Sequence, residues 1–211
     1  MGEGRVGKTS LLHRFVHNTF SDAQTPTLRA TYAEKTVRCD DGARVALRVW
    51  DTAGQERFHA LGPIYYRDAD AAVLVYDITD RESFERVKRW VTELKRMTTR
   101  DDFHDVGAVA VALCVCGNKS DLERSRAVSN ADGEAYAKSV GAEFYSASAK
   151  ANKCVEAVFV SVANRLEKAR RARGGAGAGA GAGTTTTTSG GRTSLKIADE
   201  DAPTPTGGAC C

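Results

Sequence analysis

The chain has 211 residues, of which 42% are hydrophobic, and this is enough for one domain with a sizeable core. Its net charge of +3 is too small to indicate a nucleic-acid partner, which requires basic residues gathered on one face. Apolar runs in the sequence stay well short of the roughly 18 residues that cross a bilayer, so any membrane contact is expected to be peripheral.

A phosphate-binding motif, G-x-x-x-x-G-K-[ST], extends from Gly2 to Thr9. Glycines in such a loop let successive backbone N–H groups converge on phosphate oxygens, while Lys8 supplies a positive charge and Thr9 a hydroxyl for Mg²⁺. Apolar residues recur at helical spacing from Lys8 to about Asn18, which predicts the helix that follows the loop. The residues expected at the phosphates are Gly2, Gly4, Arg5, Val6, Gly7, Lys8 and Thr9.

The strand that normally leads into this motif has no counterpart in the sequence, because only Met1 precedes Gly2. We therefore expect the first, central strand of the sheet to be missing. Two explanations are open: the true start lies upstream of Met1, or the chain is a short form without that strand.

A loop and a hairpin are predicted next. Phe20–Thr31 is polar and contains a proline, which predicts a loop. The segments Tyr32–Cys39 and Val45–Trp50 flank Asp40-Asp41-Gly42, and this combination predicts an antiparallel pair of strands joined by a tight turn.

A second phosphate motif, Asp51-Thr52-Ala53-Gly54, follows the hairpin directly. At the end of a strand, the Asp51 carboxylate can reach Mg²⁺ through water and the Gly54 N–H can meet a γ-phosphate. Gln55 is the next residue and can orient an attacking water.

Beyond this motif, buried strands alternate with amphipathic helices. Continuous apolar runs at Ala71–Tyr76 and Val109–Cys116 predict strands covered on both faces, and Glu143–Tyr145 is a shorter candidate. Helices are predicted at Ser83–Arg96 and Cys154–Arg170. This order predicts an α/β fold of the P-loop NTPase type, a doubly wound and mostly parallel sheet with one antiparallel edge strand and helices on both faces.

A C-x-C pair, Cys114 and Cys116, lies inside the second apolar run. We expect the two side chains to point to opposite faces of the strand. Packing in the core is therefore favoured over metal binding.

Two polar loops follow predicted strands, at the edge where open α/β sheets bind ligands. In Asn118-Lys119-Ser120-Asp121, the Asp121 carboxylate can accept hydrogen bonds from N1–H and the exocyclic amine of guanine, and adenine has no such donors. Ser148-Ala149-Lys150 follows the last predicted strand in the same way. After a phosphate-binding loop, the two segments favour GTP over ATP as the ligand.

The character of the chain changes at Gly174, where Gly-Ala repeats begin and Thr-rich sequence follows. Such sequence cannot bury enough apolar surface to offset its ordering entropy. We predict a domain at residues 1–173 and a disordered tail at 174–211 that ends in Cys210 and Cys211. A cluster of basic residues before the tail could attract anionic lipid, or it could simply be the solvated end of the last predicted helix. It consists of Lys168, Arg170, Arg171 and Arg173.

The complete set of motifs resembles a Rab protein of the Ras superfamily of small GTPases. The resemblance covers about residues 2–173 and the last two residues. It is carried further by Arg57-Phe58-His59-Ala60-Leu61, Tyr65-Tyr66-Arg67-Asp68-Ala69 and Leu74-Val75-Tyr76-Asp77-Ile78-Thr79. The run from Trp50 to Thr79 is most similar to the Rab twenty-one subgroup, relatives of the early-endosomal Rab-five group.

The resemblance implies roles for individual residues. Thr27 matches the switch threonine that binds Mg²⁺ and senses the γ-phosphate, Phe20 matches the aromatic residue against guanine, and Gln55 matches the catalytic glutamine. The implied metal ligands are Thr9, Thr27 and Asp51. The further nucleotide contacts that it implies are Ser10, Phe20, Thr27, Gly54, Asn118, Lys119, Asp121, Ser148, Ala149 and Lys150.

The resemblance also implies partners and a location. Tyr32, Trp50 and Tyr65 match the aromatic triad of the effector surface, although aromatic packing would explain them as well. Cys210 and Cys211 resemble a signal for double geranylgeranylation, and two lipids give stable anchoring where one is marginal. The expected partners are GTP and GDP, an exchange factor, a GTPase-activating protein, a GDP dissociation inhibitor, a Rab escort protein and effectors. The expected location is the cytoplasmic face of endosomal or other vesicular membranes, with cycling through the cytosol.

Two hypotheses for the function follow. The first is a Mg²⁺-dependent GTPase that regulates vesicular traffic, with slow hydrolysis because the sequence has no obvious arginine finger in cis. The second is a weakly nucleotide-binding module that keeps the effector surface but lacks the central strand of the sheet.

Overall fold

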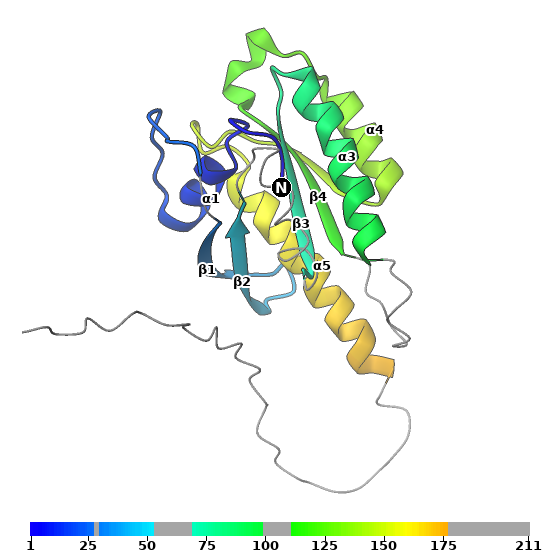
Figure 1. The fold of residues 1–211 in the computed structure, drawn as a ribbon. Coiled ribbons are helices and arrows are strands. Elements are labelled where there is room, and N and C mark those ends of the chain that lie inside the picture. Colours follow the sequence, from blue (N-terminus) through cyan, green and yellow to red (C-terminus); the bar gives the residue numbers. More distant parts are fainter. Residues whose placement is uncertain (28–29, 53–68, 99–110, 177–211) are drawn as a thin grey trace, which may run out of the picture.

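The strands of the protein form two separate sheets in the computed structural model, which describes residues 1–27, 30–52, 69–98 and 111–176 (Figure 1). The first sheet is the antiparallel pair of β1 (Thr31–Arg38) and β2 (Arg44–Asp51). The turn between them is closed by hydrogen bonds from the Cys39 N–H to the Ala43 carbonyl and from the Gly42 N–H to the Cys39 carbonyl. The predicted hairpin is confirmed.

The second sheet is parallel and contains β3 (Ala71–Asp77), β4 (Ala112–Asn118) and β5 (Glu143–Ser146) in that order. Every residue of β4 is buried, as expected for a strand covered by helices on both faces. β4 continues past its predicted end because Asn118 is still paired with Asp77 of β3. The predicted α/β class is confirmed, and the antiparallel pair is a sheet of its own.

The first residues of the chain lie beside β3. The Met1 ammonium donates to the Val73 carbonyl at 2.7 Å, and the Met1 carbonyl accepts from the Val75 N–H at 2.8 Å. Bonding to residues on either side of Leu74 is the pattern of a parallel pair. Among the described residues, β2 and β3 belong to different sheets and are not hydrogen-bonded to each other.

Helices cover both faces of the parallel sheet (Figure 1). α1 (Lys8–His17) and α5 (Val155–Ala176) lie on the side of the β1–β2 hairpin, whereas α3 (Arg81–Thr98) and α4 (Asn130–Val140) lie on the other. The three helices predicted from apolar spacing are confirmed, with small shifts at their ends. None of the helices in the described part of the chain is long and apolar enough to cross a membrane.

Two hydrophobic cores flank the parallel sheet because successive strand residues point to opposite faces. Val75 belongs to the core with α1 and α5, whereas Leu74 and Tyr76 belong to the core with α3 and α4. Phe15 of α1 stacks on Phe159 of α5 with 3.8 Å between ring centroids, which joins the helix after the phosphate loop to the last helix.

The expectation that Cys114 and Cys116 point to opposite faces is wrong. Residues two apart in a strand share a face, and both thiols are completely buried in the core with α1 and α5. Burial raises the pKa of Cys114 to about 12 and that of Cys116 well above its ordinary value. Packing is therefore the role of both residues, as predicted.

Two elements escaped prediction: the 3₁₀ helix Ser120–Ser125, which follows β4, and α4. The buried residues of α4 are the small Gly133 and Ala137, so an apolar stripe is hardly visible in its sequence. The ends of α4 carry the signals that could have revealed it. The Ser129 side chain accepts from the Asp132 N–H, and Gly141 ends the helix in a left-handed conformation.

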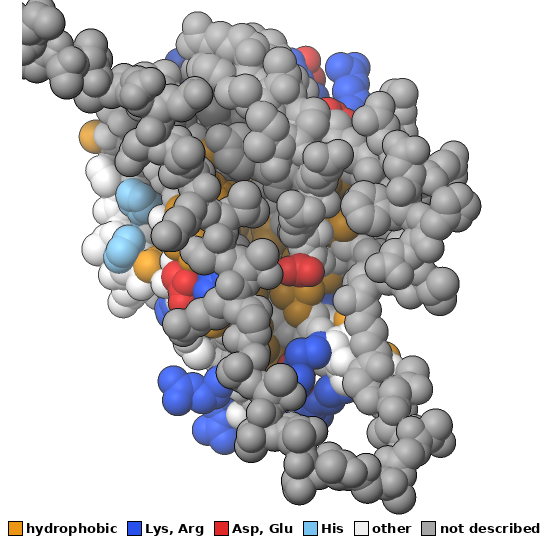
Figure 2. All heavy atoms as spheres, turned by 60° about the horizontal axis from the view of Figure 1, so that its bottom comes forward, with side chains coloured by type: hydrophobic (Ala, Val, Ile, Leu, Met, Phe, Trp, Pro, Cys, Tyr) orange, Lys and Arg blue, Asp and Glu red, His pale blue; other side chains and the backbone are white. Residues whose placement is uncertain are grey.

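The end of the molecule that carries the C-terminus of α5 is mixed in charge. Figure 2 brings this end forward and shows groups of Lys and Arg side chains with acidic side chains among them. Arg170 and Arg171 both pair with Glu167, and Arg171 also reaches Asp41 in the hairpin turn at 2.7 Å. Part of the basic cluster is therefore neutralised within the domain.

Candidate functional site

The phosphate loop, residues 2–9, leads into α1 with the open geometry of an anion site. Gly7 is the N-cap with φ +91°, and neither a side-chain cap nor an acidic residue occupies the first turn. The first backbone N–H groups of α1 therefore remain available for a negatively charged ligand. A Cβ at Gly7 would lie 2.5 Å from the Asn118 side chain, so glycine is required where the phosphate loop meets β4.

Lys8 folds back over the phosphate loop. Its Nζ donates to the Gly2 carbonyl at 2.9 Å and to the Glu3 carbonyl at 2.8 Å. Burial lowers the pKa of Lys8 to about 8, against the opposing attraction of Asp51 and Glu3. The ammonium is thus held by neutral acceptors that an anion could replace.

Three oxygen-bearing side chains meet beside the phosphate loop, from α1, from the loop after it and from the end of β2. The Thr9 hydroxyl lies 2.6 Å from Asp51 Oδ2 and 2.7 Å from the Thr27 hydroxyl, and Thr27 lies 3.4 Å from the same carboxylate oxygen. Hard oxygen donors of this kind fit Mg²⁺, which is bound through one or two carboxylates together with substrate phosphates. No cluster of three or more His, Cys, Asp or Glu side chains occurs in the described residues, so a magnesium site would use these hydroxyls.

Asn118 joins the phosphate loop to the loop after β5. Its Nδ2 donates to the Val6 carbonyl at 2.9 Å, and its Oδ1 accepts from the Ala149 N–H at 3.2 Å. The side chain is only 2% exposed, so both contacts are shielded from water. Asn118 therefore links these two segments through a buried side chain.

Asp121 lies at the surface with its carboxylate held by the Ser148 hydroxyl. Ser148 in turn accepts from the Ala151 N–H at 2.9 Å, which fixes the direction of its hydroxyl. A carboxylate has about four lone-pair sites, so Asp121 retains acceptor capacity for a ligand. The contact of Asp121 with a base stays a prediction.

The loop after α1 reaches across to the loop after β5. Asp22 pairs with Lys150 Nζ at 2.9 Å, and the same nitrogen lies 6.0 Å from the centroid of the Phe20 ring. These contacts place an aromatic ring and an apolar lysine stem on the same side of the site.

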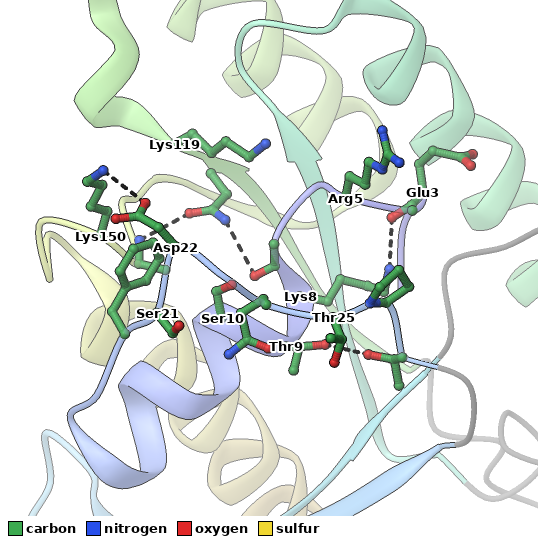
Figure 3. Close-up of a pocket in the computed structure, with 18 of the residues that line it drawn as sticks. Glu3, Arg5, Lys8, Thr9, Ser10, Ser21, Asp22, Thr25, Lys119 and Lys150 are labelled. Carbon is green, nitrogen blue, oxygen red and sulfur yellow. Dashed lines mark hydrogen bonds and ion pairs between the residues drawn. The ribbon is translucent and has the colours of Figure 1, made fainter.

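A cavity of about 710 Å³ is lined by most of these groups (Figure 3), whereas Asp51 is buried beside Thr9 and is not part of the lining. Its size lies within the range of small-molecule sites. Gly2, Val6 and Ser148, which were also predicted to contact nucleotide, are buried behind the lining and support it through their neighbours. The predicted nucleotide-binding residues that line the cavity are Gly4, Arg5, Gly7, Lys8, Thr9, Ser10, Phe20, Thr27, Asn118, Lys119, Asp121, Ala149 and Lys150.

Five further predicted residues lie outside the described part of the chain. They are Gly54, Gln55, Tyr65, Cys210 and Cys211.

Comparison with known proteins identifies the family. The family model described as Ras family matches residues 1–168. The chain is 45% identical to the Ras-related protein Rab-21 of Mus musculus over 215 residues, covering 100% of this chain and 89% of the relative. The chain belongs to the Ras family, in its Rab branch.

Two other relatives support the placement of this Rab chain within its branch. The Ras-related protein Rab-21 of Dictyostelium discoideum is 49% identical, over 79% of this chain and 74% of the relative. The Ras-related protein Rab-5A of the same organism is 42% identical, over 83% of this chain and 82% of the relative. The resemblance to a Rab-21-like and Rab-5-like subgroup is confirmed.

Two of the three predicted effector residues of this Rab protein, Tyr32 and Trp50, lie on the hairpin, away from the cavity lining. Tyr32 is 48% exposed and Trp50 is 52% exposed, and their rings meet edge to face with 5.3 Å between centroids. Tyr32 also donates to Glu34 at 2.8 Å. Exposed aromatic side chains that contact one another favour an interaction surface over core packing.

Sequence reasoning missed three charged residues around the site of this Rab protein. Asp77 pairs with Lys119, Arg86 of α3 pairs with Glu3 of the phosphate loop, and Asp22 pairs with Lys150. Asp77 carried a usable signal, because it follows a buried strand at the ligand edge of the sheet. The other two contacts join segments far apart in the chain and leave no local pattern.

Proposed function

We propose that this Rab protein is a Mg²⁺-dependent guanine-nucleotide switch that hydrolyses GTP slowly and recruits effectors at vesicle membranes, endosomal membranes in particular. One observation carries the proposal: a single cavity has phosphate-type groups at one end and guanine-type groups at the other. Lys8 and the start of α1 form the first end, and Asp121 with Phe20 and Lys150 forms the second. A cavity that brings both kinds of group together suits a nucleoside phosphate.

The residues at the phosphate end have separate tasks in this proposal. Lys8 exchanges its two carbonyl acceptors for phosphate oxygens, and Thr9, Thr27 and Asp51 hold Mg²⁺. The ion supplies positive charge to the β- and γ-phosphates when it is bound. Gln55 orients the attacking water, a role carried over from the Rab resemblance.

The switch itself follows from the position of Thr27. This residue comes from the loop before β1 and contacts both Thr9 and Asp51, so its place depends on what occupies the metal site. We expect GTP to hold Thr27 and Gly54 and GDP to release them, with effectors reading the change near Tyr32, Trp50 and Tyr65.

Membrane attachment belongs to the tail in this proposal. Residues 1–173 form the nucleotide-binding domain, and residues 174–211 tether it to the membrane through geranylgeranyl groups on Cys210 and Cys211. Regulation is by the exchange factors, GTPase-activating proteins, escort proteins and dissociation inhibitors that act on Rab proteins.

The test is the affinity for GDP and for IDP, which lacks the exocyclic amine. Asp121 accepts that amine in our proposal, and a hydrogen bond to a charged group contributes roughly 1.5–3 kcal/mol, so GDP should bind about 10- to 100-fold more tightly. Asp121→Asn should bring the two affinities within about threefold of each other. Fluorescent GDP titrations with competing GDP or IDP, in Mg²⁺ and in excess EDTA, measure both effects.

Asp132→Asn is the matched control, because it removes an exposed carboxylate on α4 outside the cavity lining. It should leave the ratio of GDP to IDP affinity unchanged. Equal GDP preference in the wild type and in Asp121→Asn would contradict the role of Asp121. Failure of the wild type to bind any guanine nucleotide would contradict the proposed function.

A further inference from the structure

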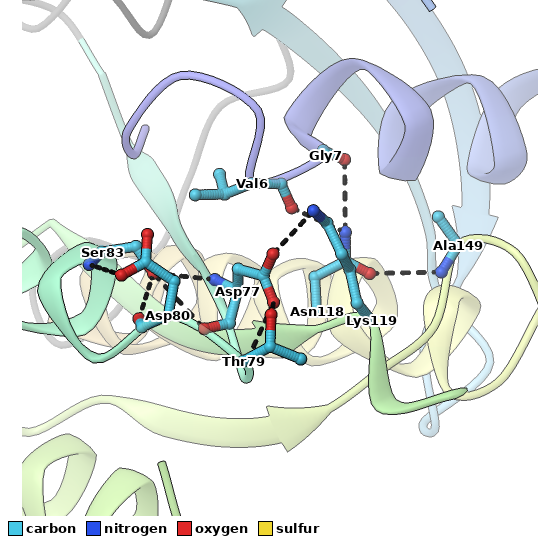
Figure 4. A network of polar contacts seen from close by, with 9 residues as sticks. All are labelled: Val6, Gly7, Asp77, Thr79, Asp80, Ser83, Asn118, Lys119 and Ala149. Atoms are coloured by element: carbon cyan, nitrogen blue, oxygen red, sulfur yellow. Dashed lines mark hydrogen bonds and ion pairs between the residues drawn. The ribbon is translucent and has the colours of Figure 1, made fainter. Parts of the chain in front are cut away.

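Asp77 is a buried carboxylate at the last position of β3, where it meets Lys119 (Figure 4). It is 8% exposed and is absent from the cavity lining, so a ligand in the cavity would not touch it. Its Oδ2 lies 2.6 Å from Nζ of Lys119, which does line the cavity. Asp77 can therefore act on a ligand only through Lys119.

The Asp77 carboxylate is itself fixed in place. Its Oδ1 accepts from the Thr79 N–H at 2.9 Å and from the Thr79 hydroxyl at 2.7 Å. The Asp77 N–H donates to the Ser83 hydroxyl at 3.0 Å, which ties its backbone to the start of α3. Burial alone would raise the pKa of Asp77, but hydrogen bonds from Lys119 and Thr79 outweigh it and hold the pKa below its ordinary value.

The backbone of Lys119 is constrained as well. It has φ +67°, an uncommon conformation for a residue with a side chain, between the end of β4 and the 3₁₀ helix. The Ile78 N–H donates to the Asn118 carbonyl at 3.1 Å, so the segments that carry Asp77 and Lys119 are also joined through their backbones. Because the backbone of Lys119 is constrained, its long side chain is the part whose position depends on Asp77.

We propose that Asp77 is a positioning residue that holds the Lys119 side chain against the base end of the cavity and so slows nucleotide dissociation. Lys119 carries a long and mobile stem, and a partly exposed ammonium would otherwise direct it toward solvent. With the ammonium held, the stem forms a stationary part of the cavity wall. This inference rests on the proposed nucleotide binding. It names a residue that sets the lifetime of the protein–nucleotide complex.

The experiment is a double-mutant cycle with Asp77→Asn and Lys119→Met, which removes the ammonium and keeps the stem. Release of fluorescent GDP into excess unlabelled GDP is followed in Mg²⁺. Asp77→Asn should accelerate release about tenfold in the wild type and by less than twofold in the Lys119→Met background. A purely structural role for Asp77 would give the same acceleration in both backgrounds, and that result would overturn the proposal.

Two further measurements separate the alternatives. Asp77 pairs with Lys119, whereas the Asp121 carboxylate, which distinguishes GDP from IDP in our proposal, is held by Ser148, so Asp77→Asn should accelerate the release of both nucleotides by the same factor. Asp80→Asn is the matched control on the same loop and should leave release unchanged, since Asp80 caps α3 and does not contact Lys119 in any described hydrogen bond or ion pair. Circular dichroism at the assay temperature checks that each variant is folded.

The outcomes distinguish this inference from the proposed function. If the wild type binds GDP and the two substitutions act additively, only the role of Asp77 is overturned. If the wild type binds no guanine nucleotide, the proposed function fails and the positioning role fails with it.

Discussion

Burial and nearby charges have opposite effects on the pKa of Lys8. Its ammonium donates to two backbone carbonyls, and burial outweighs the attraction of Asp51 and Glu3 in setting a pKa of about 8. An ordinary lysine has a pKa near 10.4 and stays charged throughout the physiological range. This residue therefore titrates close to the conditions of an ordinary binding experiment.

We predict that nucleotide binding takes up a proton above pH 8. Phosphate favours the charged ammonium and raises the pKa of Lys8, so between pH 8 and the pKa of the complex the affinity falls as pH rises, by at most about tenfold per pH unit. Calorimetric GDP titrations at pH 7.0 and 8.5, each in two buffers of different ionisation enthalpy, count the protons. Uptake is expected at the higher pH only.

Lys8→Arg is the control for this prediction, because a guanidinium does not titrate in this range. Its binding should involve no proton uptake attributable to residue 8. Equal proton uptake at both pH values in the wild type would contradict a lowered pKa for Lys8.

At the scale of elements, the C-terminal part of α5 is docked onto the β1–β2 hairpin. Asn164 Nδ2 donates to Asp40 at 2.8 Å, and Arg171 pairs with Asp41 at 2.7 Å. Glu167 accepts from both Arg170 and Arg171, and its side chain is only 7% exposed. These contacts join the separate hairpin to the helix that also packs on the parallel sheet.

We predict that Glu167 contributes acid-sensitive stability. Hydrogen bonds from Arg170 and Arg171 lower the pKa of Glu167 to about 2, from an ordinary value of 4.5. A lowered pKa stabilises the folded state fully above the unfolded value, and this contribution is lost as the pH falls from about 4.5 to 2. Glu167→Gln should therefore be less stable than the wild type at pH 7 and differ little from it near pH 2.

Urea unfolding of both proteins at a series of pH values measures this difference. Glu156→Gln, at the start of the same helix, is a control whose difference from the wild type should not follow this pattern. A pH-independent difference between Glu167→Gln and the wild type would refute the argument.

At the scale of the molecule, we expect the domain to bind nucleotide and the tail to attach to the membrane. The domain carries the cavity, whereas the two terminal cysteines are the proposed lipid sites. Substituting Ser for both Cys210 and Cys211 should abolish partition into the detergent phase after prenylation in cell extract, because two lipids are needed for stable anchoring. Each single substitution should give intermediate partition.

GDP affinity of the same variants provides the control for this experiment. It should be unchanged, since all the described residues that line the cavity come before position 151. Full detergent partition of the double variant would show that membrane attachment depends on another part of the chain.

Local sequence was sufficient for the class of fold and for most elements. Local apolar patterns predicted the strands β1 to β5 and the helices α1, α3 and α5, because each pattern reflects a face that must be buried. They failed for α4, whose buried face is made of Gly133 and Ala137. They also could not assign the five strands of the described residues to two sheets, since pairing between distant segments leaves no local signal.

By itself, the sequence determined which groups of this Rab protein are candidates for nucleotide contact, because the phosphate loop and the two predicted base loops are contiguous motifs. Only the tertiary structure decided how groups from distant segments meet. Thr9, Thr27 and Asp51 converge from a helix, a loop and a strand end, and Asp77 reaches Lys119 across neighbouring strands. The physical reason is that a motif contains residues that are neighbours in the sequence. Interactions of charges and hydroxyls depend instead on distance in space, which folding determines.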